Sequence, residues 1–116
     1  MKLNFITLFI IMFIFLGPNN DSYAADLLLG KEKAAVVCSA CHGLDGQAVS
    51  GGNSPLTPNI TAQQKEYLVA KLKDYKSGKI NHPQMSLIAQ MLTDTDIENV
   101  SEWYSSIKIL IEFPAE

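Results

Sequence analysis

Residues 38–42, Cys38-Ser39-Ala40-Cys41-His42, carry the most informative pattern in this chain. The C-x-x-C-H spacing is the attachment signal for c-type haem. Cys38 and Cys41 lie about one helical turn apart, so each thiol can form a thioether with a haem vinyl group. His42 then offers a neutral imidazole nitrogen to the iron as its proximal ligand. The pentapeptide therefore predicts one covalently bound haem.

Other uses of the same residues fit the sequence less well. A thioredoxin-like C-x-x-C requires a preceding strand, whereas the segment before Cys38 has the pattern of a helix. A zinc site would need Cys38, Cys41, His42 and His82, which are all the cysteines and histidines of the chain. Cys41 and His42 are sequence neighbours, which suits a shared tetrahedral ion poorly. A disulfide between the two cysteines would close too short a loop to constrain the chain much.

The opposite face of the iron needs a second ligand, and three residues are candidates. Met85 follows a proline-containing loop that can hold it rigidly over the haem. Met91 lies on the next helical segment and is better suited to packing, since methionine is a common core residue. His82, beside Pro83, would give bis-histidine ligation and a lower reduction potential. The residues alone do not separate Met85 from Met91.

Hydrophobic periodicity on either side of the motif predicts an all-α domain. Residues 26–37 form a short helix that begins at Asp26. Its side chains available for burial are Leu27, Leu28, Ala34, Ala35 and Val37. Residues 43–58 are a loop rich in glycine and proline. A second helix follows, with Thr61 and Gln64 as its capping box and Gly78 at its end. The apolar stripe of this helix is Leu68, Leu72 and Tyr75.

The carboxyl-terminal half continues the helical pattern. Residues 79–84 form another loop, and residues 85–92 hold one or two helical turns. Thr93 caps a last helix, and Asp94 and Asp96 in its first turn favour the positive end of the helix dipole. The inward stripe of this helix is Ile97, Val100, Tyr104 and Ile107, with Trp103 beside it.

The amino-terminal segment, residues 1–24, has the order of a cleaved secretory signal peptide. Lys2 precedes an apolar run over residues 3–16, and small residues follow where the peptidase cuts. The run is shorter than the ~20 apolar residues of a membrane span, although an uncleaved anchor is the alternative. Cleavage after Ala24, with Ala25 as the competing position, leaves a domain at 25–106 and an apolar tail at 107–116. We therefore expect a periplasmic protein without a transmembrane segment after cleavage.

Charge narrows the range of partners. The chain has nine Lys and no Arg against twelve Asp and Glu, a net charge of −3, which argues against general nucleic-acid binding. Lysines concentrate in residues 65–79 and acids in residues 94–116. A solvated helix face explains either cluster, and the functional alternative is a lysine surface that steers an acidic redox partner. The lysines in question are Lys65, Lys71, Lys73, Lys76 and Lys79.

Three segments together resemble the class I cytochromes c, in particular the small bacterial periplasmic kind and each half of the di-haem periplasmic cytochromes. They are GKEKAAVVCSACHGLDG (30–46), PNITAQQKEYLVAKLKDYKSG (58–78) and PQMSLIAQMLTDTDIENVSEWY (83–104). The resemblance implies the class I fold, with three to four helices wrapped around one covalently bound haem. It implies Met85 as the second axial ligand and the Pro58 carbonyl as the hydrogen-bond acceptor of His42. It also implies that Gly30 lets the first helix cross close to the last, where Trp103 packs.

The same resemblance places Lys79 near a haem propionate, where the family more often has Arg. Ser101 and Glu102 replace the usual pair of alanines, and the 107–116 tail is more apolar than the family requires. The expected function is one-electron Fe(III)/Fe(II) transfer in the periplasm, with redox partner proteins and no enzymatic activity of its own. A haem subunit of a larger periplasmic oxidoreductase is the alternative, and a haem-based ligand sensor is a more distant one.

Overall fold

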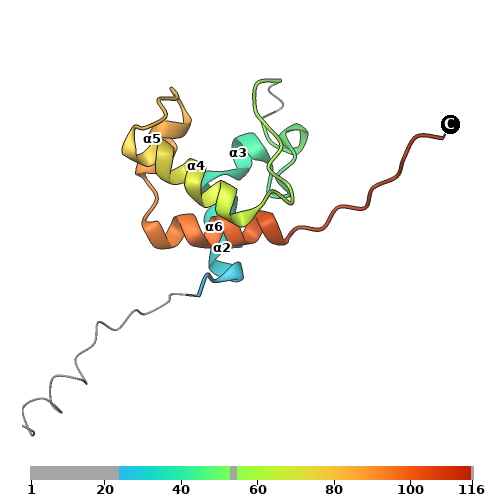
Figure 1. The fold of residues 1–116 in the computed structure, drawn as a ribbon, viewed down its shortest axis with the longest axis horizontal. Helices are drawn as coiled ribbons and strands as arrows, with labels where there is room; N and C mark the ends of the chain where they lie inside the picture. The colour runs from blue at the N-terminus through green and yellow to red at the C-terminus, as the bar shows by residue number, and fades with distance from the viewer. Residues whose placement is uncertain (1–23, 53–54, 116) are drawn as a thin grey trace, which may run out of the picture.

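The computed structural model describes residues 24–52 and 55–115, and over them the chain is helical without a strand (Figure 1). The elements in order are α2 (Leu27–Val37), α3 (Ser39–His42), the 3-10 turn η1 (Ala48–Ser50), α4 (Lys65–Ser77), α5 (Met85–Gln90) and α6 (Asp94–Ser106). The expected all-α class is confirmed. The expected signal peptide lies outside the described residues, apart from Ala24.

Helix α2 crosses α6 at a glycine. A Cβ atom on Gly30 would overlap the carbonyl oxygen of Asn99 and would lie 3.3 Å from the Cβ of Trp103. Only glycine permits this approach, so the expected close crossing beside Trp103 is confirmed. The side chain of Asn99, which is buried, strengthens the crossing because its Oδ1 accepts the Asp26 N–H at 2.8 Å.

Fewer side chains of α2 are buried than the sequence predicts. Asp26 caps the helix as expected and accepts the N–H groups of Leu28 and Leu29. Ala34, one turn after Gly30, is fully buried, but Leu27 is 46% exposed and Leu28 is 64% exposed. Only the face that carries Gly30 and Ala34 meets α6, so the leucines in the first turn point away from the core.

Helix α4 begins later than expected. The capping box of Thr61 with Gln64 is wrong, because the Thr61 hydroxyl donates to the carbonyl of Asp45 at 2.6 Å. Ala62 then adopts a positive φ of 54°, and Gln64 precedes the helix without a side-chain cap. The helix ends as expected at Gly78, whose φ of 78° lies in the left-handed region that favours glycine.

Helix α6 supplies the largest fully buried side chains of the core. Thr93 and Asp96 form a capping box at its start, so the expected cap is confirmed. Ile97, Val100 and Tyr104 are at most 2% exposed, as the inward stripe predicts. The core cluster consists of Ala34, Leu68, Val100 and Tyr104, with Cys38, Leu44, Ile60, Leu72, Trp103 and Ile107 packed against it.

The segment after α6 is extended and leads away from the domain (Figure 1). Ile107 still packs against the core, but Leu110 is 97% exposed and Phe113 is 88% exposed. The described part of the tail therefore does not wrap back onto the helices. Within residues 24–115, as far as they are described, no helix has the length and apolar character needed to cross a membrane.

Candidate haem-attachment site

The C-x-x-C-H motif forms a single helical turn directly after α2. Cys38 ends α2, and the N–H of His42 donates to the carbonyl of Cys38 at 3.0 Å. Both thiols are free, with Cys38 partly buried and Cys41 exposed. A helical turn holds positions i and i+3 on one face, which is the arrangement that two thioether bonds to one planar group require. The residues present therefore fit a covalently attached haem.

Cys38 faces the core rather than solvent. Burial raises the pKa of its thiol to about 11, although a hydrogen bond with the side chain of Tyr104 opposes this rise. Burial also raises the pKa of Tyr104 above its ordinary value. Both groups are therefore uncharged at neutral pH, which lowers the cost of packing them in the core.

His42 is buried and its orientation is fixed. Its side chain is 8% exposed, and Nδ1 lies 3.0 Å from the carbonyl oxygen of Pro58. A carbonyl oxygen only accepts, so Nδ1 carries the ring proton and Nε2 keeps a free lone pair. This is the tautomer that an iron ligand needs, and the hydrogen bond increases the basicity of the ring. The contact with Pro58 is the one that the resemblance implies.

Two aromatic side chains of α6 hold the chain just after the motif. The Tyr104 hydroxyl donates to the carbonyl of Gly43 at 3.0 Å, and Trp103 Nε1 donates to the carbonyl of Leu44 at 2.9 Å. The N–H of Ala62 donates in turn to the carbonyl of Tyr104 at 2.9 Å. The sequence predicts that both rings lie near the core but not these partners. The one hint in the sequence to these hydrogen bonds is that a tyrosine hydroxyl and a tryptophan N–H need a partner when they are buried.

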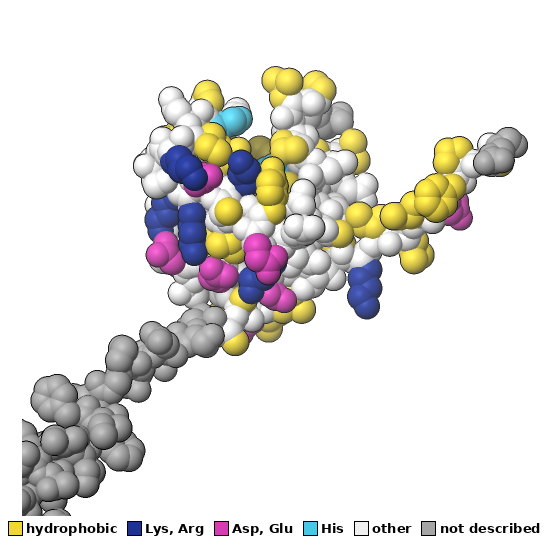
Figure 2. Space-filling model, in the orientation of Figure 1, with side chains coloured by type: hydrophobic (Ala, Val, Ile, Leu, Met, Phe, Trp, Pro, Cys, Tyr) yellow, Lys and Arg dark blue, Asp and Glu magenta, His cyan; other side chains and the backbone are white. Residues whose placement is uncertain are grey.

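Across the molecule, α5 packs on α4 and begins at Met85. The Met85 side chain is partly buried, whereas Met91 is 68% exposed, so the expected packing of Met91 is wrong. His82 is exposed, and its Nδ1 accepts N–H groups from Gln84 and Met85. Figure 2 shows the surface hollowed between the α5 region and the loop after α3, with hydrophobic side chains along both rims.

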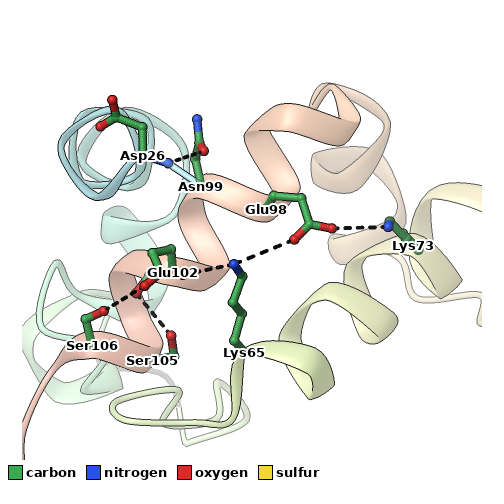
Figure 3. A network of polar contacts seen from close by, with 8 residues as sticks. All are labelled: Asp26, Lys65, Lys73, Glu98, Asn99, Glu102, Ser105 and Ser106. Carbon is green, nitrogen blue, oxygen red and sulfur yellow. Dashed lines mark hydrogen bonds and ion pairs between the residues drawn. The ribbon is translucent and has the colours of Figure 1, made fainter. Parts of the chain in front are cut away.

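Three of the five expected docking lysines lie against acidic side chains of α6. Lys65 pairs with Glu102 at 2.9 Å and lies 3.9 Å from Glu98, which also pairs with Lys73 at 3.3 Å (Figure 3). Two further pairs join Lys76 to Asp94 at 2.8 Å and Lys79 to Asp74 at 3.0 Å. The hydrogen bond with Glu102 raises the pKa of Lys65, and that with Lys76 lowers the pKa of Asp94. Lys71 instead lies over the ring of Tyr67.

The structure does not favour a thioredoxin-like motif or a zinc site at the C-x-x-C-H segment. Helix α2, not a strand, precedes Cys38. Over the described ranges 24–52 and 55–115, no three His, Cys, Asp or Glu side chains lie so that they can hold a metal ion. A zinc site made by Cys38, Cys41, His42 and His82 is therefore not formed there.

Comparisons with known proteins agree on one family. The family model described as cytochrome c matches residues 28–108, more than half of the chain. Cytochrome c-554(548) of Halomonas halodenitrificans is 40% identical over 86 residues, which are 72% of this chain and 98% of that protein. The cytochrome subunit of sulfide dehydrogenase from Chlorobaculum tepidum is 28% identical over 76 residues, 66% of this chain and 64% of that protein.

A solved structure is also similar. Reduced recombinant cytochrome c4 from Pseudomonas stutzeri has a TM-score of 0.63 and 32% identity, and the match covers 73% of this chain and 47% of that chain. This chain therefore spans about half the length of cytochrome c4.

Proposed function

The chain belongs to the class I cytochrome c family, and we propose that it carries single electrons through one haem attached at Cys38 and Cys41, with His42 and Met85 as axial ligands. The family is one of electron carriers, not enzymes, and it implies a covalently bound c-type haem. The observation that carries the residue assignment is the 3.0 Å contact between His42 Nδ1 and the Pro58 carbonyl, on the turn that holds both thiols.

The protein residues act by holding and orienting. When bound, the haem supplies a one-electron Fe(III)/Fe(II) couple. The Pro58 carbonyl accepts the Nδ1–H of His42, so Nε2 would be the atom that holds the iron. Met85 would hold it through a thioether, which favours a higher reduction potential than a second imidazole. With His42 and Met85 both bound, the iron would have no position open to oxygen or peroxide, and the haem would supply outer-sphere electron transfer. Lys79 would face a propionate.

We also propose that the protein works in the periplasm. The proposal rests on the signal-peptide pattern of residues 1–24, with cleavage after Ala24 and the domain at 25–106. The lysines Lys65, Lys71, Lys73, Lys76 and Lys79 would contribute to docking of an acidic redox partner. Because most of them pair with acids, we expect their contribution to be small.

The second candidate function is that of a haem subunit in a larger periplasmic oxidoreductase. The exposed apolar side chains of the tail favour it, since Leu110 and Phe113 have no contact with the domain that would cover them. A relative is named as the cytochrome subunit of sulfide dehydrogenase. Sedimentation of the native protein separates a free carrier from a subunit.

The attachment is tested with exported protein. The wild type should show a c-type haem absorption spectrum, and acid-acetone should not extract the pigment. Cys38→Ala together with Cys41→Ala should abolish covalent attachment, because both thioether positions are lost. Ala40→Ser is the matched control, since residue 40 is an exposed spacer position in the same motif. A colourless wild-type protein with two unmodified thiols would contradict the proposal.

A further inference from the structure

We propose that His82 is a positioning residue that fixes the start of α5, and with it Met85, through the Nδ1 atom of its ring. The inference rests on the proposed ligation by Met85. It also assigns His82 a role that is neither that of an axial ligand nor that of a free surface histidine.

The hydrogen bonds at the start of α5 converge on His82. Its Nδ1 accepts the N–H of Met85 at 3.1 Å and the N–H of Gln84 at 3.3 Å. The first N–H groups of a helix have no partner within the helix and need an external acceptor. Gln84, which directly precedes α5, makes no capping bond with its side chain. The ring of His82 is therefore the side-chain cap of the helix that carries Met85.

Three further contacts hold the His82 ring and backbone in place. Ser86 Oγ accepts the His82 N–H at 3.0 Å and donates to the carbonyl of Ile80 at 3.2 Å, and the Ser86 N–H donates to the carbonyl of His82 at 3.1 Å. The ring of Tyr75 on α4 meets the His82 ring edge-on, with centroids 5.9 Å apart and planes at 70°. Pro83, the next residue, restricts the backbone of His82.

The tautomer of His82 is opposite to that of His42. An Nδ1 that accepts N–H groups has no proton, so a neutral His82 ring carries its proton on Nε2. A histidine bonded to iron through Nε2 must instead have that nitrogen unprotonated, as His42 does. His82 therefore cannot cap α5 through Nδ1 and bind iron through Nε2 at the same time. With His82 as the cap, Met85 is the ligand that the start of α5 presents.

The test compares His82→Ala with His82→Asn in the haem-loaded protein. Alanine removes the acceptor, whereas the Asn side-chain oxygen can accept the same N–H groups. In His82→Ala we expect the fraction of iron without Met85 to rise about fivefold, the effect of losing about one net hydrogen bond. The far-red sulfur-to-iron band of the oxidised protein should weaken, and carbon monoxide should bind the reduced protein faster by the same factor. His82→Asn should stay close to the wild type.

Thr93→Ala is the matched control, because it removes the cap of α6 without touching the start of α5. It should lower stability while leaving the carbon monoxide rate unchanged. If His82→Ala keeps the band and the rate of the wild type, His82 does not position Met85. If His82→Asn is as perturbed as His82→Ala, the acceptor role is wrong.

Failure of the proposed ligation gives a different result. A wild type without the far-red band would contradict ligation by Met85 before any variant is made. A nitrogen-15 NMR spectrum of the histidine rings in the wild type reports the His82 tautomer independently of the haem absorption bands. A proton on Nε2 and none on Nδ1 supports the cap, and the reverse overturns it.

Discussion

His42 and His82 show how one residue type takes two roles through its hydrogen bonds. The Pro58 carbonyl faces Nδ1 of His42, whereas two backbone N–H groups face Nδ1 of His82. The first ring is left with a free Nε2 lone pair and the second with an Nε2 proton. The motif in the sequence assigns His42 as one ligand and leaves His82 as a candidate for the opposite face, because the backbone groups that orient the His82 ring have no signal in the sequence.

Replacement of Met85 tests the proposed second ligand. Met85→Ala should open the iron and lower the reduction potential by on the order of 0.2 V, because a thioether ligand is lost. The far-red band should disappear from the oxidised spectrum. Met91→Ala is the matched control, since Met91 lies at the other end of the same short helix and is 68% exposed. Loss of the band in Met91→Ala instead would transfer the ligand role to Met91.

Ser101 offers a prediction of increased stability. Its side chain is 0% exposed, and its Oγ has no hydrogen-bond partner among the described residues. A buried hydroxyl without a partner costs about 1–3 kcal/mol, and alanine is also the better helix former. Ser101→Ala should therefore raise the free energy of unfolding by about 1 kcal/mol, measured by guanidinium denaturation. An unchanged or lower midpoint would show that the hydroxyl is satisfied.

At the scale of single elements, the start of α6 makes stability depend on pH. Burial alone would raise the pKa of Asp96, but hydrogen bonds from Thr93 and Lys33 hold it below the ordinary value. The carboxylate accepts from Thr93 N–H at 2.9 Å and from its hydroxyl at 2.8 Å, and it pairs with Lys33 at 3.1 Å. A lowered pKa means that the folded state favours the ionised form, so this stabilisation is present at neutral pH and lost in acid.

Asp96→Ala should therefore cost about 1 kcal/mol of unfolding free energy at neutral pH, a typical value for a helix cap. The difference from the wild type should shrink as the pH falls below about 4, where Asp96 protonates in the unfolded chain and then in the folded one. Chemical denaturation at a series of pH values measures this. A difference that stays constant down to low pH would mean that the charge of Asp96 contributes nothing.

The elements themselves were predictable where the signal is local. The caps by Asp26 and Thr93, the stop at Gly78 and the stripe of α6 all depend on residues within a turn or two of one another, and all four are present. The failed capping box at Thr61 depends on Asp45, sixteen positions away. The anchors of the loop after the motif, Tyr104 on Gly43 and Trp103 on Leu44, are more remote still, at 61 and 59 positions. Hydrogen-bond partners that lie this far apart along the chain leave no local sequence pattern from which they could be predicted.

At the scale of the whole molecule, the packing of α4 beside α6 changes the meaning of the charge distribution. Along the chain, lysines and acids fall in separate segments, which predicts one basic and one acidic region. In the folded protein these segments lie side by side and their side chains pair (Figure 3). Opposite charges at contact distance largely cancel each other's field at distances well beyond their separation. The basic surface is therefore largely neutralised by the fold.

This neutralisation predicts how electron transfer responds to salt. Oxidation of the reduced protein by ferricyanide, an anion, should depend only weakly on ionic strength in the wild type. Glu98→Gln together with Glu102→Gln removes the acids that face Lys65 and Lys73, so the rate at low salt should rise by about two- to fivefold and its salt dependence should steepen. Glu32→Gln with Glu112→Gln changes the net charge equally but at exposed positions on α2 and the tail, away from these lysines. If both double variants respond alike, net charge alone governs the encounter, and the lysines of α4 have no particular role in docking.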